Sequence, residues 1–392
     1  LSGRFKTPVL NGAFFHQSTY RDLFGADGLN VTVGLRLDYE KLKLNYDAGY
    51  ALTHTYALSG ILSPANRVIE MIKPTDIAAA NQLVGKLNHD YLQLLPKFAL
   101  QYDFNKRSNV YASVTRGYRS GGFNVQNFSD LLSSDMQAAM MKGVAETTIP
   151  VIENTPAIPS AAKAVVLEVM NRLKSAGQEA EIEKSTLYKP EYSWNYEVGS
   201  HLTAFGGKLQ ADVAAFLMDT HDQQISRFSE KGLGRETVNA GKSRSWGGEA
   251  SLKAQLTDDF SLSGNYGYTN ATFSNGDYEG NYVPFVPKHT FYAGAQYIFR
   301  FSKDRWFDHV AVNADYKAAG RIYWTENNRA SQALYGTLNG RISLNKGNGQ
   351  IAFWVNNILN KHYQTFYFET MGRGFAQNGR PIQAGIDIRC CF

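Results

Sequence analysis

A regular alternation of apolar and polar residues runs along much of this chain of 392 residues. It is clearest from position 29 to position 40, where apolar residues occupy the odd positions and polar residues or glycine stand between them. The apolar residues are Leu29, Val31, Val33, Leu35, Leu37 and Tyr39. Because successive side chains of a β-strand point to opposite faces, this pattern predicts a strand with one apolar and one polar face.

About 13 segments carry this two-faced pattern, and a membrane-crossing strand needs about 9–11 residues, a length that most of them exceed. They are residues 10–22, 28–46, 90–104, 107–120, 188–205, 207–226, 235–255, 259–274, 288–301, 306–323, 330–345, 348–370 and 380–392. In a soluble sandwich or fibre domain, so many long strands would require an unusually wide core. The pattern therefore favours strands whose apolar faces meet lipid.

The connections between these segments alternate between short and long. The short ones lie at 104–107, 205–208, 257–259 and 345–349, and the long ones at 47–89, 121–187, 275–287 and 371–379. Short turns on one rim and long loops on the other are typical of an outer-membrane barrel. The sequence thus predicts an all-β fold, a transmembrane antiparallel β-barrel with long extracellular loops.

Two of the long loops are expected to carry short helices that pack over the barrel. Apolar residues recur at helical spacing after Ser160, at Val165, Val166, Val169, Met170 and Leu173. A similar spacing occurs at Ile77, Ala80, Leu83, Val84 and Leu87. We therefore predict one helix in each loop.

The segment 28–46 yields a more detailed prediction. Val31, Val33 and Leu35 should face lipid, whereas Gly34, Arg36 and Asp38 should face the lumen. After Glu40 and Lys41 the apolar residues move to the even positions, as Leu42, Leu44 and Tyr46 show. A β-bulge, which inserts one extra residue into a strand, is expected there.

Bacterial single-chain barrels have an even number of strands. Thirteen strands that end in a strand descending to the periplasm therefore imply an odd number of strands upstream. The first residues contain no Met and no signal pattern. We expect the chain to be the C-terminal part of a larger barrel or one piece of a split barrel.

Other classes of protein find little support. No run of 18 apolar residues predicts a transmembrane helix. Metalloprotease, serine-hydrolase and Cys-x-x-Cys signatures are absent, and Gly241-Lys242-Ser243 resembles a phosphate loop whose first glycine is replaced by Glu236. The eight histidines are dispersed, and the neighbours Cys390 and Cys391 form neither a disulfide framework nor a zinc site. The net charge of +5 has no basic cluster. We expect no catalytic residue, metal site, cofactor or nucleic-acid partner.

Several short motifs together resemble TonB-dependent outer-membrane receptors, particularly the ferric-siderophore branch. The motifs are Gly34-Leu35-Arg36-Leu37-Asp38-Tyr39, residues 111–124, Tyr188-Lys189-Pro190-Glu191, residues 194–199, Gly247-Gly248-Glu249, residues 286–290, residues 355–363 and Gly379-Arg380-Pro381 before a strand that ends at Phe392. Each motif is weak alone, but their shared order covers nearly the whole chain.

The resemblance implies a barrel of about 22 strands whose plug domain and first strands are absent from residues 1–392. It implies a protein of the bacterial outer membrane that imports a scarce nutrient, most simply a ferric siderophore, with energy from the TonB complex. Cobalamin or heme import and a non-transporting barrel or adhesin remain alternatives. Expected neighbours are outer-membrane lipid and lipopolysaccharide, with a surface lipoprotein or a missing N-terminal half as further partners. In the family, a terminal aromatic such as Phe392 is read by the barrel-assembly machinery.

The candidate ligand contacts are aromatic or cationic residues expected on the rim with the long loops. They are Arg119, Phe123, Tyr323, Trp324, Arg329, Tyr367, Phe368 and Arg373. Aromatic rings supply contact area, and arginine pairs with carboxylate or catecholate oxygen. An ordinary aromatic girdle at the membrane interface would explain the aromatic ones equally well.

Overall fold

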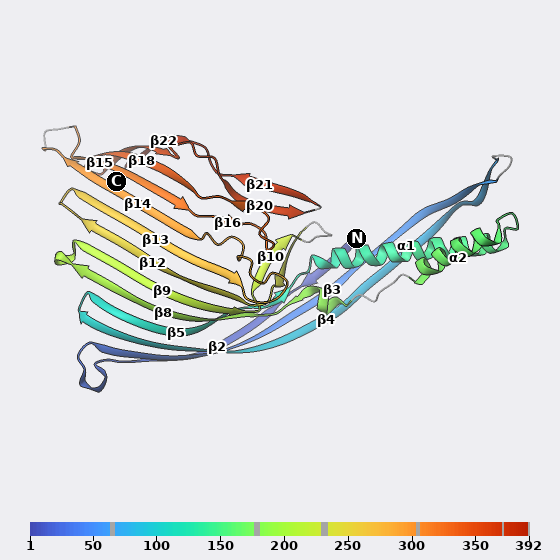
Figure 1. The fold of residues 1–392 in the computed structure, drawn as a ribbon, viewed down its shortest axis with the longest axis horizontal. Helices are drawn as coiled ribbons and strands as arrows, with labels where there is room; N and C mark the ends of the chain where they lie inside the picture. The colour runs from blue at the N-terminus through green and yellow to red at the C-terminus, as the bar shows by residue number, and fades with distance from the viewer. Residues whose placement is uncertain (63–66, 176–180, 229–233, 303–305, 371, 391–392) are drawn as a thin grey trace.

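The computed structural model describes residues 1–62, 67–175, 181–228, 234–302, 306–370 and 372–390. Its main feature is one curved antiparallel sheet, drawn in Figure 1. The strands of this wall are β1 (Ser2–Lys6), β2 (Val9–Tyr20), β3 (Leu29–Leu62), β4 (Arg67–Asn105), β5 (Ser108–Arg119), β8 (Glu191–Ala204), β9 (Leu209–His221), β12 (Ser243–Gln255), β13 (Phe260–Phe273), β14 (His289–Arg300), β15 (His309–Ala319), β18 (Tyr335–Lys346), β19 (Gly349–Asn356) and β22 (Gln383–Cys390).

The wall strands follow one another in sequence order, each paired with its neighbour along the chain. β1 and β2 both pair with β3 in one continuous register, so the 14 strands of the described sheet occupy 13 positions. The break between them contains Pro8, which has no N–H to give to a ladder. The expected number of wall strands is therefore confirmed within the described residues.

The alternation of connections is also confirmed. Tight turns, including the 3₁₀ turns η1 (Leu23–Gly25) and η2 (Phe205–Gly207), join strands at one end of the wall. At the other end, four small hairpins of the described residues rise from the long connections. They are β6 (Gly122–Phe123) with β7 (Leu187–Tyr188), β10 (Gln224–Phe228) with β11 (Arg235–Asn239), β16 (Ile322–Tyr323) with β17 (Ser331–Gln332), and β20 (Gln364–Thr370) with β21 (Arg373–Asn378). Several predicted segments, such as 207–226 and 235–255, join a wall strand to the adjacent strand of such a hairpin, because both strands alternate with period two.

The two faces of the wall differ in chemistry as the alternation predicts. Val33 and Leu35 lie on the outer face and are about half exposed in the isolated chain, at 47% and 49%. Arg36 and Asp38 lie on the opposite face, where the Arg36 Nε donates to Asp38 Oδ2 over 2.8 Å. The predicted lipid and lumen orientations of residues 28–46 are consistent with this arrangement. No helix in the described residues is both long and apolar enough to cross a membrane.

The predicted loop at 47–89 is wrong, as is the helix predicted within it. β3 and β4 continue far beyond the wall as one hairpin, in an unbroken register from Leu29–Tyr102 to Tyr56–Thr75. The part of β3 beyond Tyr39 would extend roughly 75 Å at about 3.3 Å per residue. This arm projects past the other strands in Figure 1. The expected bulge at Glu40 and Lys41 is also absent, because their register with Tyr91 and Asp90 is regular.

The change of apolar phase near Glu40 has a different cause. Helix α1 (Asn127–Asn154) lies against the inner face of the arm, where it covers the apolar residues at even positions of β3. Leu44 and Ala48 are buried there against Phe128 and Leu132 of α1. The apolar face thus moves from the lipid side to the helix side, and no extra residue is needed.

Polar contacts fix α1 on the arm. Tyr50 Oη and Asn81 Nδ2, from the two strands of the hairpin, both donate to Asp135 Oδ2 over 2.8 Å. Further along, Tyr56 and Thr148 share a hydroxyl hydrogen bond of 3.1 Å. These bonds set the position of the helix along the arm as well as its distance from it.

The helix expected after Ser160 is confirmed as α2 (Ser160–Ser175), which packs on α1. α1 itself, 28 residues long, was not expected, and neither was the short α3 (Ile182–Thr186). Apolar residues surround α1 on several sides, and Pro150 lies inside it. Its contact stripe of Phe128, Leu132 and Met136 nevertheless has the spacing of a helix.

We predict that Phe128→Ala releases α1 from the arm. Phe128 is 1% exposed, and its ring lies 4.9 Å from that of Phe5 and 5.0 Å from that of Tyr46. Removing such a buried ring costs about 3–5 kcal/mol. Limited proteolysis and hydrogen exchange should show α1 opening while the wall strands stay protected. Val165→Ala, at a 63% exposed position of α2, is the control and should leave α1 protected.

We also predict that a charge on the outer face destabilises the wall. Val198→Arg on β8 places a cation where lipid contact is expected, at a cost of about 2–4 kcal/mol near the bilayer midplane. Asn195→Arg on the same strand points inward, with the polar groups, and should cost far less. Denaturant unfolding of the protein in lipid vesicles measures both. Equal destabilisation would contradict the assignment of faces.

Candidate ligand-binding site among the long loops

Aromatic rings from four long connections meet at the long-loop end of the wall. Phe228 of β10 stacks on Phe368 of β20 at 4.1 Å between ring centroids. Phe285, from the connection between β13 and β14, lies 5.6 Å from both Phe366 and Trp324. The remaining pairs are Phe366–Phe368 at 5.9 Å and Phe368–Phe375 at 5.1 Å. We call these six residues the ring cluster.

Two arginines of the β10–β11 hairpin border the ring cluster. The guanidinium carbon of Arg235 lies 5.6 Å from the ring centre of Phe228 and 5.8 Å from that of Phe366, within cation–π range. Arg227 Nε donates to Glu236 Oε1 over 3.0 Å, and its Nη1 donates to Tyr278 Oη over 3.3 Å. Burial opposes the charge of Arg227, but the hydrogen bond and attraction of Glu236 outweigh it and raise the pKa of Arg227.

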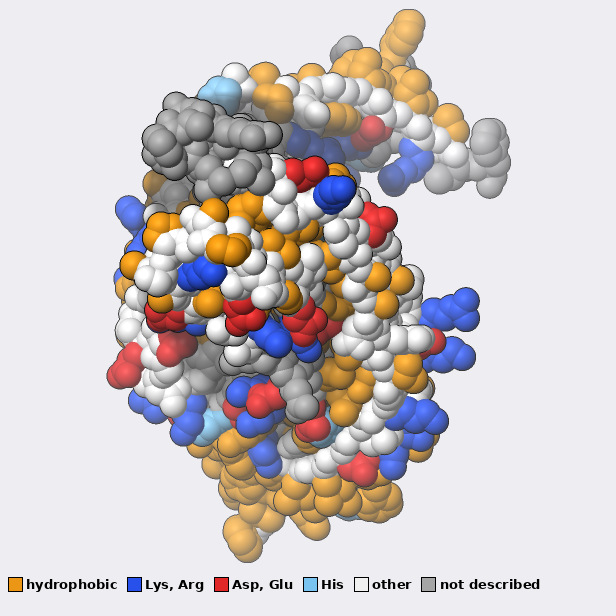
Figure 2. Space-filling view, turned by 90° about the vertical axis from the view of Figure 1, so that its right-hand side faces the viewer, with side chains coloured by type: hydrophobic (Ala, Val, Ile, Leu, Met, Phe, Trp, Pro, Cys, Tyr) orange, Lys and Arg blue, Asp and Glu red, His pale blue; other side chains and the backbone are white. Residues whose placement is uncertain are grey.

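A cavity of about 170 Å³ lies between these elements. Its lining combines rings of the cluster with charged and polar groups from the same loops. The lining residues are Ser226, Arg227, Phe228, Arg235, Tyr278, Phe285, Trp324, Thr325, Glu326, Asn327, Phe366, Tyr367, Phe368 and Glu369. Two arginines therefore face two glutamates, and the lining has no formal net charge. Figure 2, which looks at this end of the molecule, shows acidic and basic side chains intermingled over it.

Trp324 contributes a hydrogen-bond donor that has no partner within the described part of the chain. The residue is 6% exposed, and its Nε1–H is buried without an acceptor among the described residues. A buried donor left in this way costs about 1–3 kcal/mol relative to a satisfied one.

Side-chain amides hold the hairpins in place around the cavity. Asn124, after β6, donates through Nδ2 to Thr237 O over 2.8 Å and accepts from Thr237 N through Oδ1 over 2.9 Å. Asn328 joins two other loops, because its Nδ2 donates to Tyr282 O and its Oδ1 accepts from Tyr282 N. Asn328 has a φ of 56°, a left-handed conformation that asparagine tolerates better than most residues.

A second cavity, of about 270 Å³, lies between the end of β13, the connection from β13 to β14, and β16. Tyr323 is one of its lining residues. The Tyr323 ring stacks on Tyr282 at 5.1 Å, and Lys288 Nζ lies 5.4 Å from the centre of the Tyr282 ring. The hydrogen bond from Lys288 to the Tyr282 hydroxyl, together with the attraction of that group, raises the pKa of Lys288. This cavity offers a cation beside an aromatic pair.

The structure brings only some of the predicted contact residues together. Trp324, Tyr367 and Phe368 line the first cavity, and Tyr323 lines the second. Arg119 pairs across the ladder with Glu191, and Phe123 packs against the core of the arm. Arg329 and Arg373 are exposed outside both linings. Phe392 and Cys391 lie outside the described residues, whereas Cys390 is exposed.

Most of the ring cluster and both bordering arginines were not predicted from the sequence. Phe228, Phe285, Phe366, Phe375, Arg227 and Arg235 were missed. One signal was present, because Phe366 and Phe368 alternate on one face of β20 while Tyr367 lies between them. The meeting of β10, β16 and β20 had no signal in the sequence, since these hairpins are far apart along the chain.

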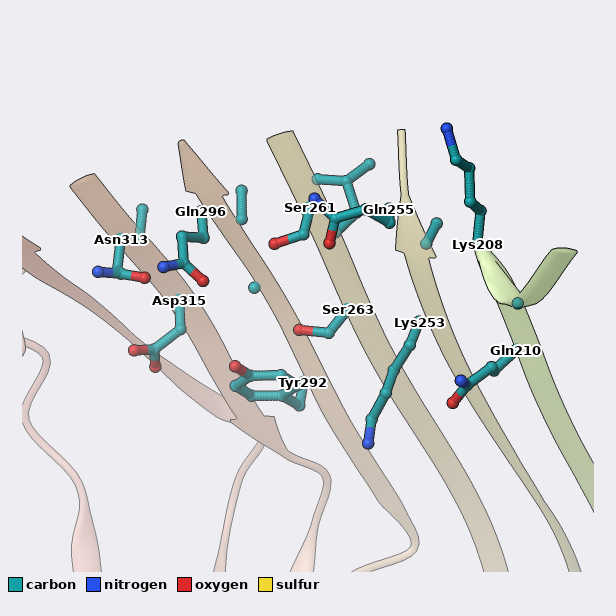
Figure 3. A pocket seen from close by; sticks show the side chains of 16 residues that line it. Lys208, Gln210, Lys253, Gln255, Ser261, Ser263, Tyr292, Gln296, Asn313 and Asp315 are labelled. Carbon is teal, nitrogen blue, oxygen red and sulfur yellow. The ribbon is translucent and has the colours of Figure 1, made fainter. Parts of the chain in front are cut away.

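The inner wall carries polar hollows nearer the tight turns. One of them, shown in Figure 3, is a hollow of about 460 Å³ lined by residues of five neighbouring strands and the turn at Lys208. Gln210, Lys253, Ser263, Tyr292 and Asp315 are among its side chains and point to the same side of the sheet. A wet, hydrogen-bonding interior is typical of a large outer-membrane barrel.

A curved antiparallel wall with an apolar outer face, a polar inner face and all its elaborate loops at one end defines a β-barrel membrane protein with a receptor-like surface. The model of the family "TonB dependent receptor-like, beta-barrel" matches residues 11–358, and the chain belongs to this family. The family consists of receptors and transporters of the bacterial outer membrane rather than enzymes, and this chain is an outer-membrane protein.

Known relatives resemble the chain over part of their length. A pesticin receptor of Yersinia pestis is 27% identical over 205 residues, which are 52% of this chain and 29% of the relative. The ferric yersiniabactin uptake receptor FyuA from Yersinia pestis covers the whole chain with a TM-score of 0.67 at 19% identity, and the chain covers 47% of that structure. The unliganded ferric citrate transporter FecA gives a TM-score of 0.53 at 16% identity, over 99% of this chain and 55% of the other. The solved structures share the fold of this chain. The chain spans about half the length of FyuA, and its match to the pesticin receptor spans 29% of that relative.

We predict that Glu236→Gln loosens the β10–β11 hairpin. The substitution removes the charge that faces the half-buried Arg227, and a hydrogen bond to a charged group is worth about 1.5–3 kcal/mol. Hydrogen exchange of the β10 and β11 amides should become faster. Glu181→Gln breaks the exposed Glu181–Lys184 pair and serves as a control, because surface pairs contribute about 0–1 kcal/mol.

Proposed function

We propose that this protein binds a ferric siderophore at the cell surface and imports it to the periplasm with energy from the TonB complex. The observation that carries the proposal is the ring cluster with its cavity, built by four loops of a TonB-dependent receptor barrel. Concave sites rich in aromatic side chains, with a few placed polar groups, are the usual form of a small-molecule site. The relatives named as ferric yersiniabactin and ferric citrate receptors support the same class of cargo.

We further propose that residues 1–392 form the C-terminal part of a barrel of about 22 strands, as the resemblance implies. The two edges of the sheet support this proposal. In the described residues β2 pairs only with β3, and β22 pairs only with β19. Backbone groups at a lipid-exposed edge must find hydrogen-bond partners, and further strands would supply them.

The remaining predicted contacts belong to the same proposal. Arg119, Arg329 and Arg373 would form an outer ring of cations around the mouth, with Phe123 and Tyr323 behind them. Lipopolysaccharide would contact the apolar outer wall. A surface lipoprotein would be a further partner, but ligand binding at the ring cluster does not require one.

The proposal predicts selective binding by the intact receptor. Purified receptor should bind at least one ferric siderophore more tightly than heme or cobalamin, and cells that depend on it should take up that iron only with an active TonB complex. Equilibrium binding and uptake of radioactive iron measure the two parts. A preference for heme or cobalamin would identify a different importer, and binding of none of these would favour a non-transporting barrel or adhesin.

A double variant tests the outer cations. Arg119→Ala with Arg329→Ala should weaken ferric-siderophore binding by about 1–3 kcal/mol for each charged hydrogen bond that is lost. Lys106→Ala with Lys208→Ala removes the same charge at the tight-turn end and should leave the affinity unchanged. Unchanged affinity in the Arg119/Arg329 variant would remove these two arginines from the site while leaving the ring cluster in place.

A further inference from the structure

A group of cations lies on the outer face of the sheet, where the arm leaves the wall. Phe5 of β1 and Leu44 of β3 face α1 on the inner side, so the residues that alternate with them face outward. The outward cations are Arg4, Lys6, Lys41, Lys43 and Lys86, and the outward carboxylates at the same level are Asp47 and Asp90. We call the five cations the basic patch. Cations outnumber carboxylates on this part of the outer face.

Only part of this charge is balanced within the described chain. Lys41 Nζ lies 3.5 Å from Asp90 Oδ1. Asp47 accepts a hydrogen bond of 2.7 Å from Gln82 Nε2. The cations of the patch that have no ion pair with a described residue are Arg4, Lys6, Lys43 and Lys86. The basic patch therefore has room for an anionic partner from outside the described chain.

Three of the unpaired cations surround one asparagine. Asn45 of β3 lies opposite Lys6 of β1 on one side and opposite Lys86 of β4 on the other. Neighbouring strands are about 4.8 Å apart, and Lys43, the adjacent outward residue of β3, lies about 7 Å from Asn45 along the strand. Like charges at such positions repel one another unless an anion lies among them. The flexible stems of the three lysines allow their ammonium groups to converge on one phosphate.

The basic patch lies at the height of the lipid headgroups. At about 3.3 Å per residue and a tilt of about 45°, the strand from Leu29 to Lys41 crosses roughly 28 Å, and the hydrocarbon core is about 30 Å thick. Tyr102, opposite Leu29, and Tyr39, just before Lys41 on the outer face, are aromatic residues at the two ends of this span. Aromatic girdles mark both interfaces of a membrane barrel. The cations therefore begin where the apolar band ends, on the side of the long loops.

We propose that the basic patch binds the phosphate groups of a lipopolysaccharide molecule in the outer leaflet. The three lysines hold one phosphate over Asn45, whose side-chain amide is a further donor. The acyl chains of the same molecule lie against Leu35 and Leu37 below. The bound lipid holds the base of the arm at a fixed height above the membrane. This inference uses the membrane location of the chain and not its cargo, so it stands or fails separately from ferric-siderophore import.

The test titrates the purified receptor with lipid A, the phosphate-bearing lipid part of lipopolysaccharide, and measures bound lipid by native mass spectrometry. Lys43→Gln with Lys86→Gln should weaken binding of lipid A that carries both phosphates about 25-fold, because each cation near an anionic lipid surface contributes about 5-fold. Lys73→Gln with Lys97→Gln removes the same charge near the tip and on the inner face of the same hairpin. This control should leave lipid binding unchanged.

Changes to the lipid separate the phosphates from the acyl chains. Lipid A without phosphates should bind the unaltered receptor as weakly as lipid A with both phosphates binds the Lys43/Lys86 variant. Inorganic phosphate should not displace the lipid, because it has no acyl chains to contact the wall. Equal binding of lipid A with and without phosphates, or equal binding by the receptor and the Lys43/Lys86 variant, would overturn the proposal. Displacement by inorganic phosphate would also overturn it and assign the basic patch to a soluble anion.

Discussion

Every backbone N–H and C=O group that crosses a bilayer must find a partner within the protein, because the hydrocarbon core offers no water. Inside the sheet of this chain, between its two edges, that requirement is met by ladders between neighbouring strands, each paired with the next along the sequence. Once the ladders are fixed, the period of two assigns each side chain to lipid or to the interior. The apolar outer face around Val33 and Leu35 and the polar inner hollow around Lys253 and Asp315 both follow from this single constraint.

The arm shows what happens where that constraint ends. Beyond the membrane, β3 and β4 keep their ladder, but lipid no longer covers the outer face, and the apolar residues pass to the side where α1 packs. Leu44 and Ala48 are buried by Phe128 and Leu132 instead of by lipid. The sequence thus marks the place where α1 replaces lipid, because the apolar residues of one regular strand move there from odd to even positions.

The loops use tertiary contacts that the wall does not need. Asn124 and Asn328 join separate hairpins through paired amide hydrogen bonds, and the ring cluster fills the space among them. The rigid wall below fixes where each hairpin starts, so short polar clamps are sufficient to position rings from four connections. A recognition site of this kind can change its chemistry by loop substitutions without disturbing the ladders.

The sequence by itself determined the wall: its 13 strand positions, the two faces, the rim with long loops and the helix after Ser160 follow from short-range periodicity. It also pointed to Trp324, Tyr367 and Phe368, because aromatic residues in such loops are conspicuous. Only the tertiary structure decided that residues 47–89 form an arm rather than a loop with a helix, since Ile77, Leu83 and Leu87 fit either period until α1 covers them. Likewise, the joining of Phe228, Phe285 and Phe366 depends on contacts between loops distant in sequence, which no local pattern encodes.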